Sequence, residues 1–243
     1  MANPTAAMLV IGDEILSGRT RDANMHHLAG RLTEAGIDLK EVRIVSDDRD
    51  AIIAAVTALS QAYDAVFTSG GIGPTHDDIT ADCIAAAFGA EIGVREDARQ
   101  LLQDHYDRQG MEFNEARMRM ARIPDGATLI DNPVSAAPGF IMGNVHVMAG
   151  VPSVFQAMLA SVLPGLTGGE PLTSVSVRID RGEGDIAGPL AKLAGDHPEV
   201  SFGSYPFIRD GLYGANIVIR GAPAANVEAA ADALCAIFPE AVR

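Results

Sequence analysis

A glycine-rich, acidic segment from Thr68 to Thr80 combines residue types that could bind a phosphate group. It reads Thr-Ser-Gly-Gly-Ile-Gly-Pro-Thr-His-Asp-Asp-Ile-Thr and lies between a predicted buried strand and a predicted helix. Glycines let the backbone approach a ligand closely, and the start of a helix offers unpaired N–H groups and a positive dipole end. The segment therefore predicts a loop that holds a phosphate through its backbone.

The segment matches neither of the two common nucleotide-binding motifs. The dinucleotide fingerprint needs a glycine where His76 stands, and the P-loop needs a Gly-Lys-Ser/Thr sequence that is absent. Asp77 and Asp78 would repel a bare phosphate, which favours a divalent cation, Mg²⁺ or Co²⁺, that bridges them to the ligand. Hydrogen bonding to a ligand ring or hydroxyl is a second explanation. A third is purely structural, with Asp78 capping the helix and Asp77 solvated.

The elements that position this loop follow from the hydrophobic pattern. Two short apolar segments and one alternating segment are separated by two helical segments, and this order of strands and helices predicts parallel strand pairing. The expected strands are 8–11, 37–45 and 65–68, with helices at 24–35 and 48–61. Further along, we expect helices at 80–88, 96–122 with a break near Gly110, and 152–163, and short strands at 127–130, 139–142 and 146–148. Residues 1–166 are thus predicted to form one α/β domain.

A change of pattern marks a second, smaller domain at 167–243. Residues 167–171 have linker composition. Beyond them we expect strands at 173–179, 201–205 and 215–220 and helices at 185–194 and 224–238. This β-α-β-β-α order predicts a small α+β appendage of the split-βαβ kind.

Composition narrows the classes of partner. The formal charge of −14, with Lys40 and Lys192 the only lysines among 18 basic residues, argues against nucleic acid as a partner. Cys83 and Cys235 lie in apolar segments and are interpreted as buried thiols, which fits a reducing cytoplasm. No signal peptide or membrane-spanning segment is expected.

Several motifs together resemble one family. Gly70 to Thr80 matches every fixed position of Gly-Gly-x-Gly-Pro-Thr-x-Asp-Asp-x-Thr, found in the molybdopterin-binding (MoaB/Mog) domain of molybdopterin adenylyltransferases and CinA competence/damage-inducible proteins. Other segments that resemble CinA-type chains are Gly12 to Gly18 followed by Asp22 and Asn24, Asn132 to Val134, Ala137 to Phe140, and Gly150 to Ser153. The resemblance implies a three-layer αβα, MogA-like fold for the first domain.

The resemblance also implies site residues. Asp47 and Asp78 match the acidic positions that the adenylyltransferases use at their pterin site, and they are the predicted catalytic residues. Asp77 and Asp78 are the predicted metal ligands. The predicted ligand-binding residues are Gly12, Asp13, Glu14, Ser69, Gly70, Gly71, Gly73, Pro74, Thr75, His76, Asp77, Asn132, Pro138 and Gly139. Because parallel strands end at one edge of a sheet, we expect these acidic residues to converge there.

The functions implied by the resemblance remain open at this point. They are metal-dependent hydrolysis of ADP-ribose-like pyrophosphates, binding or adenylyl transfer of molybdopterin, and a non-catalytic binding module. Four positions depart from the usual CinA residues: Ser135, Ala136, Ala149 and Val154. The nicotinamide-nucleotide deamidase domain of CinA chains is not expected. Apolar strand faces and edges in the appendage predict that the protein forms a homo-oligomer. We expect a dimer, although relatives in the family also form trimers.

Overall fold

The computed structural model describes residues 3–209 and 211–243. These form two compact units, the first ending at Gly169 and the second running from Glu170 to the last residue. Each unit has its own hydrophobic core and is described by itself.

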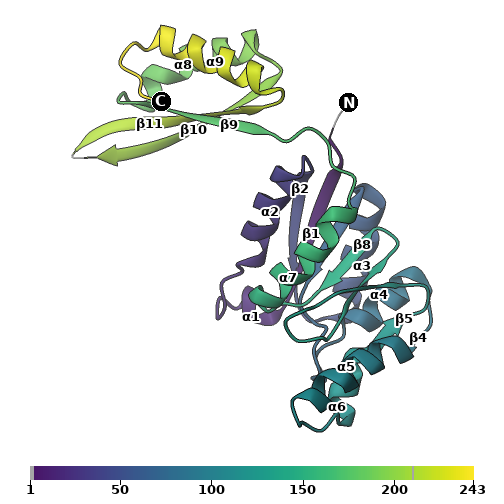
Figure 1. The fold of residues 1–243 in the computed structure, drawn as a ribbon. Coiled ribbons are helices and arrows are strands. Elements are labelled where there is room, and N and C mark those ends of the chain that lie inside the picture. Colours follow the sequence, from purple (N-terminus) through teal and green to yellow (C-terminus); the bar gives the residue numbers. More distant parts are fainter. Residues whose placement is uncertain (1–2, 210) are drawn as a thin grey trace. The chain divides into compact units, whose positions relative to one another are not determined.

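A six-stranded mixed sheet forms the centre of the first unit (Figure 1). Its strands, in spatial order, are β2 (Asp38–Val45), β1 (Thr5–Ile11), β3 (Ala65–Ser69), β8 (Val145–Met148), β7 (Gly139–Met142) and β6 (Thr128–Ile130). The first four pair in parallel, and the last two add through antiparallel pairings. The parallel pairing expected from the alternation of strands and helices is confirmed.

Helices cover both faces of this sheet. Because side chains alternate along β1, Met8 and Val10 pack toward α2 (Asn24–Glu34) and α7 (Pro152–Val162). Leu9 and Ile11 pack on the other face, in a core with α3 (Arg49–Ala62), α4 (Thr80–Phe88) and α5 (Glu96–Arg108). The first unit is therefore the three-layer αβα fold that was predicted.

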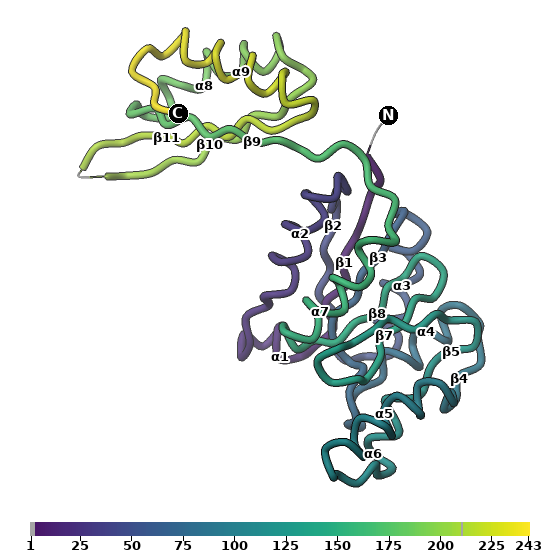
Figure 2. The backbone as a smooth tube through the Cα atoms, viewed as in Figure 1, coloured from purple at the N-terminus to yellow at the C-terminus, as the bar shows by residue number. Residues whose placement is uncertain are grey.

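The break expected near Gly110 in the helical stretch 96–122 is confirmed, but the helix expected from there to Arg122 is wrong. After α5 the chain turns at Gly110, whose φ of +64° suits glycine, and then forms α6 (Glu115–Met118) and the 3₁₀ helix η1 (Arg119–Ala121). It continues as β5 (Arg122–Pro124), which pairs with β4 (Ile92–Val94). Figure 2 shows this reversal of the chain below the main sheet. The helices α1 (Asp13–Leu16) and η2 (Leu163–Gly165) were also not anticipated.

The second unit has the predicted β-α-β-β-α order. Its antiparallel sheet has the order β10 (Val200–Arg209), β11 (Leu212–Gly221), β9 (Thr173–Ile179). The helices α8 (Glu183–Asp196) and α9 (Ala224–Ile237) share one core with the sheet.

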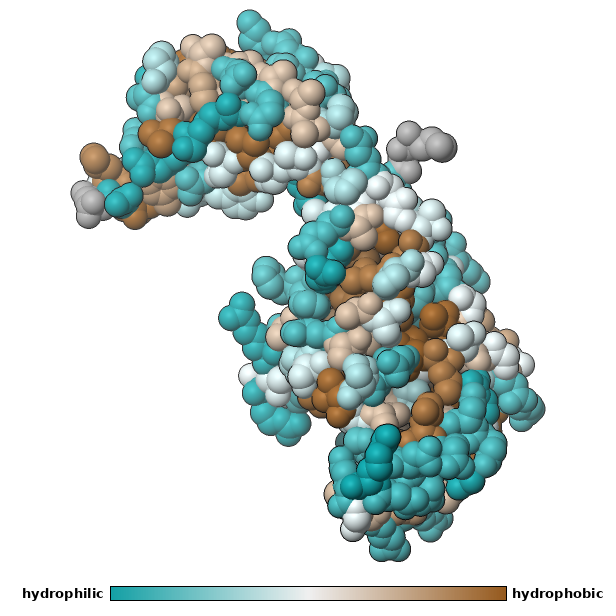
Figure 3. All heavy atoms as spheres, viewed as in Figure 1, coloured by the Kyte–Doolittle hydropathy of each residue, from teal (hydrophilic) through white to brown (hydrophobic). Residues whose placement is uncertain are grey.

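The hairpin of β10 and β11 is longer than expected. Because β9 pairs β11 only as far as Ala215, the end of the hairpin extends beyond the sheet. It exposes the apolar side chains of Ile208 and Leu212. Figure 3 shows apolar, brown atoms at the end of this hairpin.

Two further features bear on the expectations from sequence. Cys83 is a buried free thiol and Cys235 is a half-buried one. In the part of the chain that the structure describes, the helices are too short or too polar to span a bilayer.

Candidate functional site

A cavity of about 530 Å³ lies where several strands of the first unit end. Loops that follow β1, β2, β3 and β8 all contribute to it. Its lining residues are Ile11, Gly12, Glu14, Thr20, Asp47, Gly70 to Pro74, Asp77, Asp78, Met120, Asn132, Ser135, Ala137, Ala149 to Pro152 and Val154. In α/β sheets this edge is the usual place for a ligand.

The glycine loop is held in a conformation that excludes side chains at two positions. Gly70 has φ of +110°, and a Cβ there would lie 2.2 Å from the carbonyl oxygen of Ile11. Gly71 has φ of +70°, and its Cβ would lie 2.1 Å from Thr80 Oγ1. The Thr80 hydroxyl in turn donates a 3.0 Å hydrogen bond to the carbonyl of Gly70. The loop is thus fixed between the end of β1 and the start of α4.

Three consecutive backbone amides of this loop have no acceptor in the part of the chain that the structure describes. Gly70 N–H donates to the carbonyl of Met148 at 3.2 Å, which ties the loop to β8. The N–H groups of Gly71, Ile72 and Gly73 donate no hydrogen bond to any of the described residues. Because all three residues line the cavity, these amides are available to an acceptor in a ligand.

Asp47 points its carboxylate at the end of β1. Its Oδ2 accepts the backbone N–H of Asp13 at 2.9 Å. Burial raises the pKa of Asp47, the hydrogen bond from Asp13 opposes that rise, and the nearby charges of Glu14 and Asp77 add to it. Capping of α3 falls instead to Asp48, whose carboxylate accepts from Ala51 N–H at 2.9 Å. Asp47 is therefore free to serve the cavity.

Asp78 orders the loop from within. Its Oδ2 accepts both the backbone N–H of Thr75 at 2.8 Å and the Thr75 hydroxyl at 2.5 Å. The residue at the cap position of α4 is Ile79, and no side chain caps that helix. A Cβ on Gly73 would lie 2.6 Å from the same carboxylate. The helix-cap interpretation of Asp78 is therefore wrong.

The opposite wall is organised by Asn132. This buried amide donates to Ser135 Oγ at 2.7 Å and to the carbonyl of Ala137 at 2.8 Å. Ala136, inside the turn, has φ of +60°, a conformation that non-glycine residues rarely adopt. Gly139 is buried in β7, where a Cβ would lie 2.4 Å from the carbonyl of Val147.

Most of the sequence-predicted site residues line the large cavity, and the rest lie around it. Those that line it are Gly12, Glu14, Asp47, Gly70, Gly71, Gly73, Pro74, Asp77, Asp78 and Asn132. Those outside the lining are Asp13, Ser69, Thr75, His76, Pro138 and Gly139. The side chain of His76 is 99% exposed to solvent, whereas Ser69 is buried at the end of β3. Pro138 borders a smaller neighbouring cavity.

Sequence reasoning missed the loop after β8 as part of the site. A Cβ on Gly150 would lie 3.3 Å from the Cα of Gly70, so the two loops touch. Buried Asn24 joins them by donating to Ser69 Oγ at 2.7 Å and to the carbonyl of Gly150 at 2.8 Å. The parallel pairing of β3 with β8 was the missing signal, because it brings the ends of both strands to one edge.

The carboxylates do not assemble a metal site from protein donors alone. Within residues 3–209 and 211–243, no three Asp, Glu, His or Cys side chains are grouped closely enough to hold an ion. Glu14 and Asp77 are nevertheless close enough to Asp47 for their charges to raise its pKa. That donor set suits Mg²⁺, which binds through one or two carboxylates and takes its other ligands from phosphate and water.

The fold and the cavity define an α/β ligand-binding domain whose site combines free backbone amides with carboxylates. Residues 7–168 match the family model described as probable molybdopterin binding domain, and the chain belongs to this family. Residues 171–243 match a model described as FAD synthase, middle domain. The second unit is therefore more than an unassigned appendage, which corrects the expectation of a CinA-like chain that merely lacks its further domain.

Known proteins of both kinds are similar to this chain. A CinA-like protein of Citrifermentans bemidjiense is 41% identical over 67% of this chain and 40% of its own length. A probable FAD synthase of Caenorhabditis briggsae is 32% identical over 95% of this chain and 49% of its own length. The chain thus spans less than half of these two relatives.

One solved structure extends the likeness to the fold. The crystal structure of the CinA protein with unknown function from Thermoplasma acidophilum is 33% identical and has a TM-score of 0.61. The match covers 67% of this chain and 97% of that one.

Proposed function

We propose that the large cavity binds the diphosphate of a dinucleotide and that the protein hydrolyses it in the manner of an ADP-ribose pyrophosphatase. The three unpartnered amides of Gly71, Ile72 and Gly73 are the observation that carries this proposal. A row of N–H groups beside the start of α4 suits a phosphate better than a neutral ring. The cavity volume of about 530 Å³ lies in the range typical of small-molecule sites.

The acidic side of the cavity suits a divalent cation bound together with the substrate. Asp47 and Asp77 are the residues that would hold it, because both line the cavity and lie close enough for the charge of Asp77 to raise the pKa of Asp47. A bound Mg²⁺ or Co²⁺ would neutralise the diphosphate and lower the pKa of a water molecule that attacks phosphorus. The protein contributes the position of the diphosphate through the glycine loop and the position of the carboxylates through the loops after β2 and β3.

Hydrolysis with matched aspartate variants tests the proposal. The purified chain is incubated with ADP-ribose or FAD and Mg²⁺ or Co²⁺, and the release of AMP is measured. We expect turnover to stop on chelation and to fall by about a hundredfold or more in Asp47→Asn, the scale typical of lost electrostatic stabilisation at a reacting phosphate. Asp48→Asn is the control, because it makes the same change one residue away and keeps a good helix cap. Turnover that survives in Asp47→Asn refutes the catalytic role.

A second candidate is molybdopterin binding without hydrolysis, and the family match over residues 7–168 favours it. The match of residues 171–243 to the FAD synthase middle domain, and the probable FAD synthase of C. briggsae, favour FAD as the dinucleotide. Thermal shifts with ADP-ribose, FAD, AMP and molybdopterin, each with and without the cation, rank these ligands, since a ligand that binds the folded state raises the Tm. Stabilisation by molybdopterin alone would select the second candidate.

A further inference from the structure

A second, much smaller cavity opens beside the glycine loop. Its volume is about 20 Å³, enough for one water-sized group. It shares Gly71, Ile72, Gly73, Asp78 and Met120 with the large cavity, so both lie against the same loop. A single oxygen atom of a ligand fits this space, whereas a base or a pterin ring does not.

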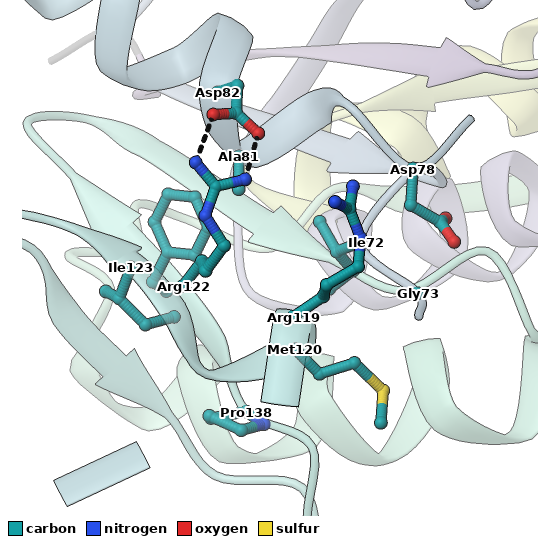
Figure 4. Close-up of a pocket in the computed structure, with 12 residues that line it drawn as sticks. Ile72, Gly73, Asp78, Ala81, Asp82, Arg119, Met120, Arg122, Ile123 and Pro138 are labelled. Carbon is teal, nitrogen blue, oxygen red and sulfur yellow. Dashed lines mark hydrogen bonds and ion pairs between the residues drawn. The ribbon is translucent and has the colours of Figure 1, made fainter. Parts of the chain in front are cut away.

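The small cavity brings positive charge to the loop. No Arg or Lys is among the residues that line the large cavity, but Arg119 and Arg122 line the small one. Figure 4 shows the guanidinium of Arg119 extending toward the space between Ile72 and Asp78.

The arginines near this site differ in what they bind. Arg122 forms a double ion pair with Asp82, at 2.8 and 2.6 Å. Arg117 lies over the ring of Tyr106, with its guanidinium carbon 4.4 Å from the ring centroid. Both of these side chains already have protein partners.

Arg119 has no such partner. Its Nε is buried without a hydrogen bond, and its guanidinium forms no ion pair or hydrogen bond with the described residues. A buried donor left without an acceptor is unfavourable, so its retention points to an acceptor that comes from outside the chain. Asp78, which also lines the small cavity, has its Oδ2 committed to Thr75.

We infer that Arg119 and the amides of Gly71 to Gly73 together bind one phosphate group, whose oxygen enters the small cavity. A guanidinium has five N–H donors in one plane and matches the oxygens of a phosphate with two parallel hydrogen bonds. Arg119 thereby supplies a positive charge to a site whose large cavity is lined by no Arg or Lys. This inference rests on the proposed binding of a diphosphate and assigns to Arg119 the recognition of one of its phosphate groups.

Binding of inorganic pyrophosphate, measured by calorimetry on the full chain, tests the inference. Arg119→Gln should weaken binding by about tenfold to a hundredfold, the loss expected for charge-assisted hydrogen bonds. Arg119→Lys should lie between, because an ammonium keeps the charge and loses the planar fork. Arg117→Gln is the matched control, since it removes the same charge two residues away from a side chain that stacks on Tyr106. It should bind as the wild-type chain does.

Thermal stability separates a ligand-binding role from a structural one. Because Arg119 has no hydrogen-bond or ion-pair partner among the described residues, Arg119→Gln should unfold at the same temperature as the wild-type chain or higher. A fall in Tm with the loss of binding would make Arg119 structural and overturn the inference. Unchanged binding in Arg119→Gln would overturn it too and leave the proposed function standing. If the wild-type chain binds neither pyrophosphate nor ADP-ribose, both proposals fail.

Discussion

Gly71→Ala should destabilise the first unit, because there is no room for a side chain at this position of the glycine loop. The new Cβ would lie 2.1 Å from Thr80 Oγ1 and 3.1 Å from Thr80 Cβ, and Thr80 is fully buried. Thr80 cannot move away without losing the 3.0 Å hydrogen bond from its hydroxyl to Gly70 and the 3.0 Å bond from its N–H to Gly71. The substitution must therefore displace the loop or the first turn of α4.

Gly89→Ala is the control that isolates this contact. Gly89 also has a left-handed φ, +64°, but a Cβ there would meet nothing within 4 Å. Both substitutions place alanine at a positive φ, which costs about 1 kcal/mol in the left-handed region. Gly71→Ala adds overpacking of about 1–3 kcal/mol and a weakened hydrogen bond of about 1 kcal/mol. We expect it to be about 2–4 kcal/mol more destabilising than Gly89→Ala.

Labelling of a buried thiol measures unfolding of the first unit by itself. Cys83 lies in α4, and burial raises its pKa to about 11, so that it reacts slowly until the unit unfolds. In a Cys235→Ala background, the urea concentration at which Cys83 becomes reactive reports the stability of this unit. Equal midpoints for Gly71→Ala and Gly89→Ala would refute the reasoning.

Three further substitutions have expected outcomes. The raised pKa of Asp47 means that its carboxyl group binds a proton more tightly in the folded chain than in the unfolded chain. Protonation of Asp47 therefore contributes its full stabilisation below the unfolded pKa of about 4, and this contribution is lost as the pH rises through the folded pKa. Asp47→Asn should therefore raise the Tm at pH 7 and match the wild type near pH 3. Asn24→Ala should cost about 2–4 kcal/mol, because it removes the hydrogen bonds to Ser69 and Gly150 and leaves a void, and denaturant titration measures this loss. Ala136→Gly should stabilise by about 0.5–1 kcal/mol in the same titration, since its φ of +60° suits glycine, and a loss of stability would contradict the strain.

The layers of the first unit could be predicted because β1 and β3 contain short apolar runs and β2 has an alternating pattern, with helical segments between them. Residues 8–11 and 65–68 are buried on both faces of the sheet, so they can be recognised as buried strands without knowing which strands pair with them. The region after α5 could not be predicted. Arg119 to Arg122 continues a helical pattern, and the turn to β5 depends on pairing with Ile92–Val94, a three-residue strand with little signal of its own.

The parts of the candidate site that follow from position along the chain could be predicted, whereas the hydrogen-bond and ion-pair partners of its side chains could not. The glycine loop follows a buried strand, and its position was clear from sequence. The roles of the aspartates were not: adjacent Asp47 and Asp48 face different partners, one at β1 and one in α3. Arg119 could not be separated from Arg117 and Arg122, because the difference lies in which arginine has an acceptor within reach.

The contact between Gly70 and Gly150 has a consequence for how this domain meets its ligands. Two loops about eighty residues apart in sequence touch backbone to backbone, and Asn24 locks them together. The floor of the cavity is pre-organised, so binding should cost little ordering entropy there. Adaptation to a different ligand then falls to the exposed rim, at Pro74 and Val151, where residues can change without repacking the interior.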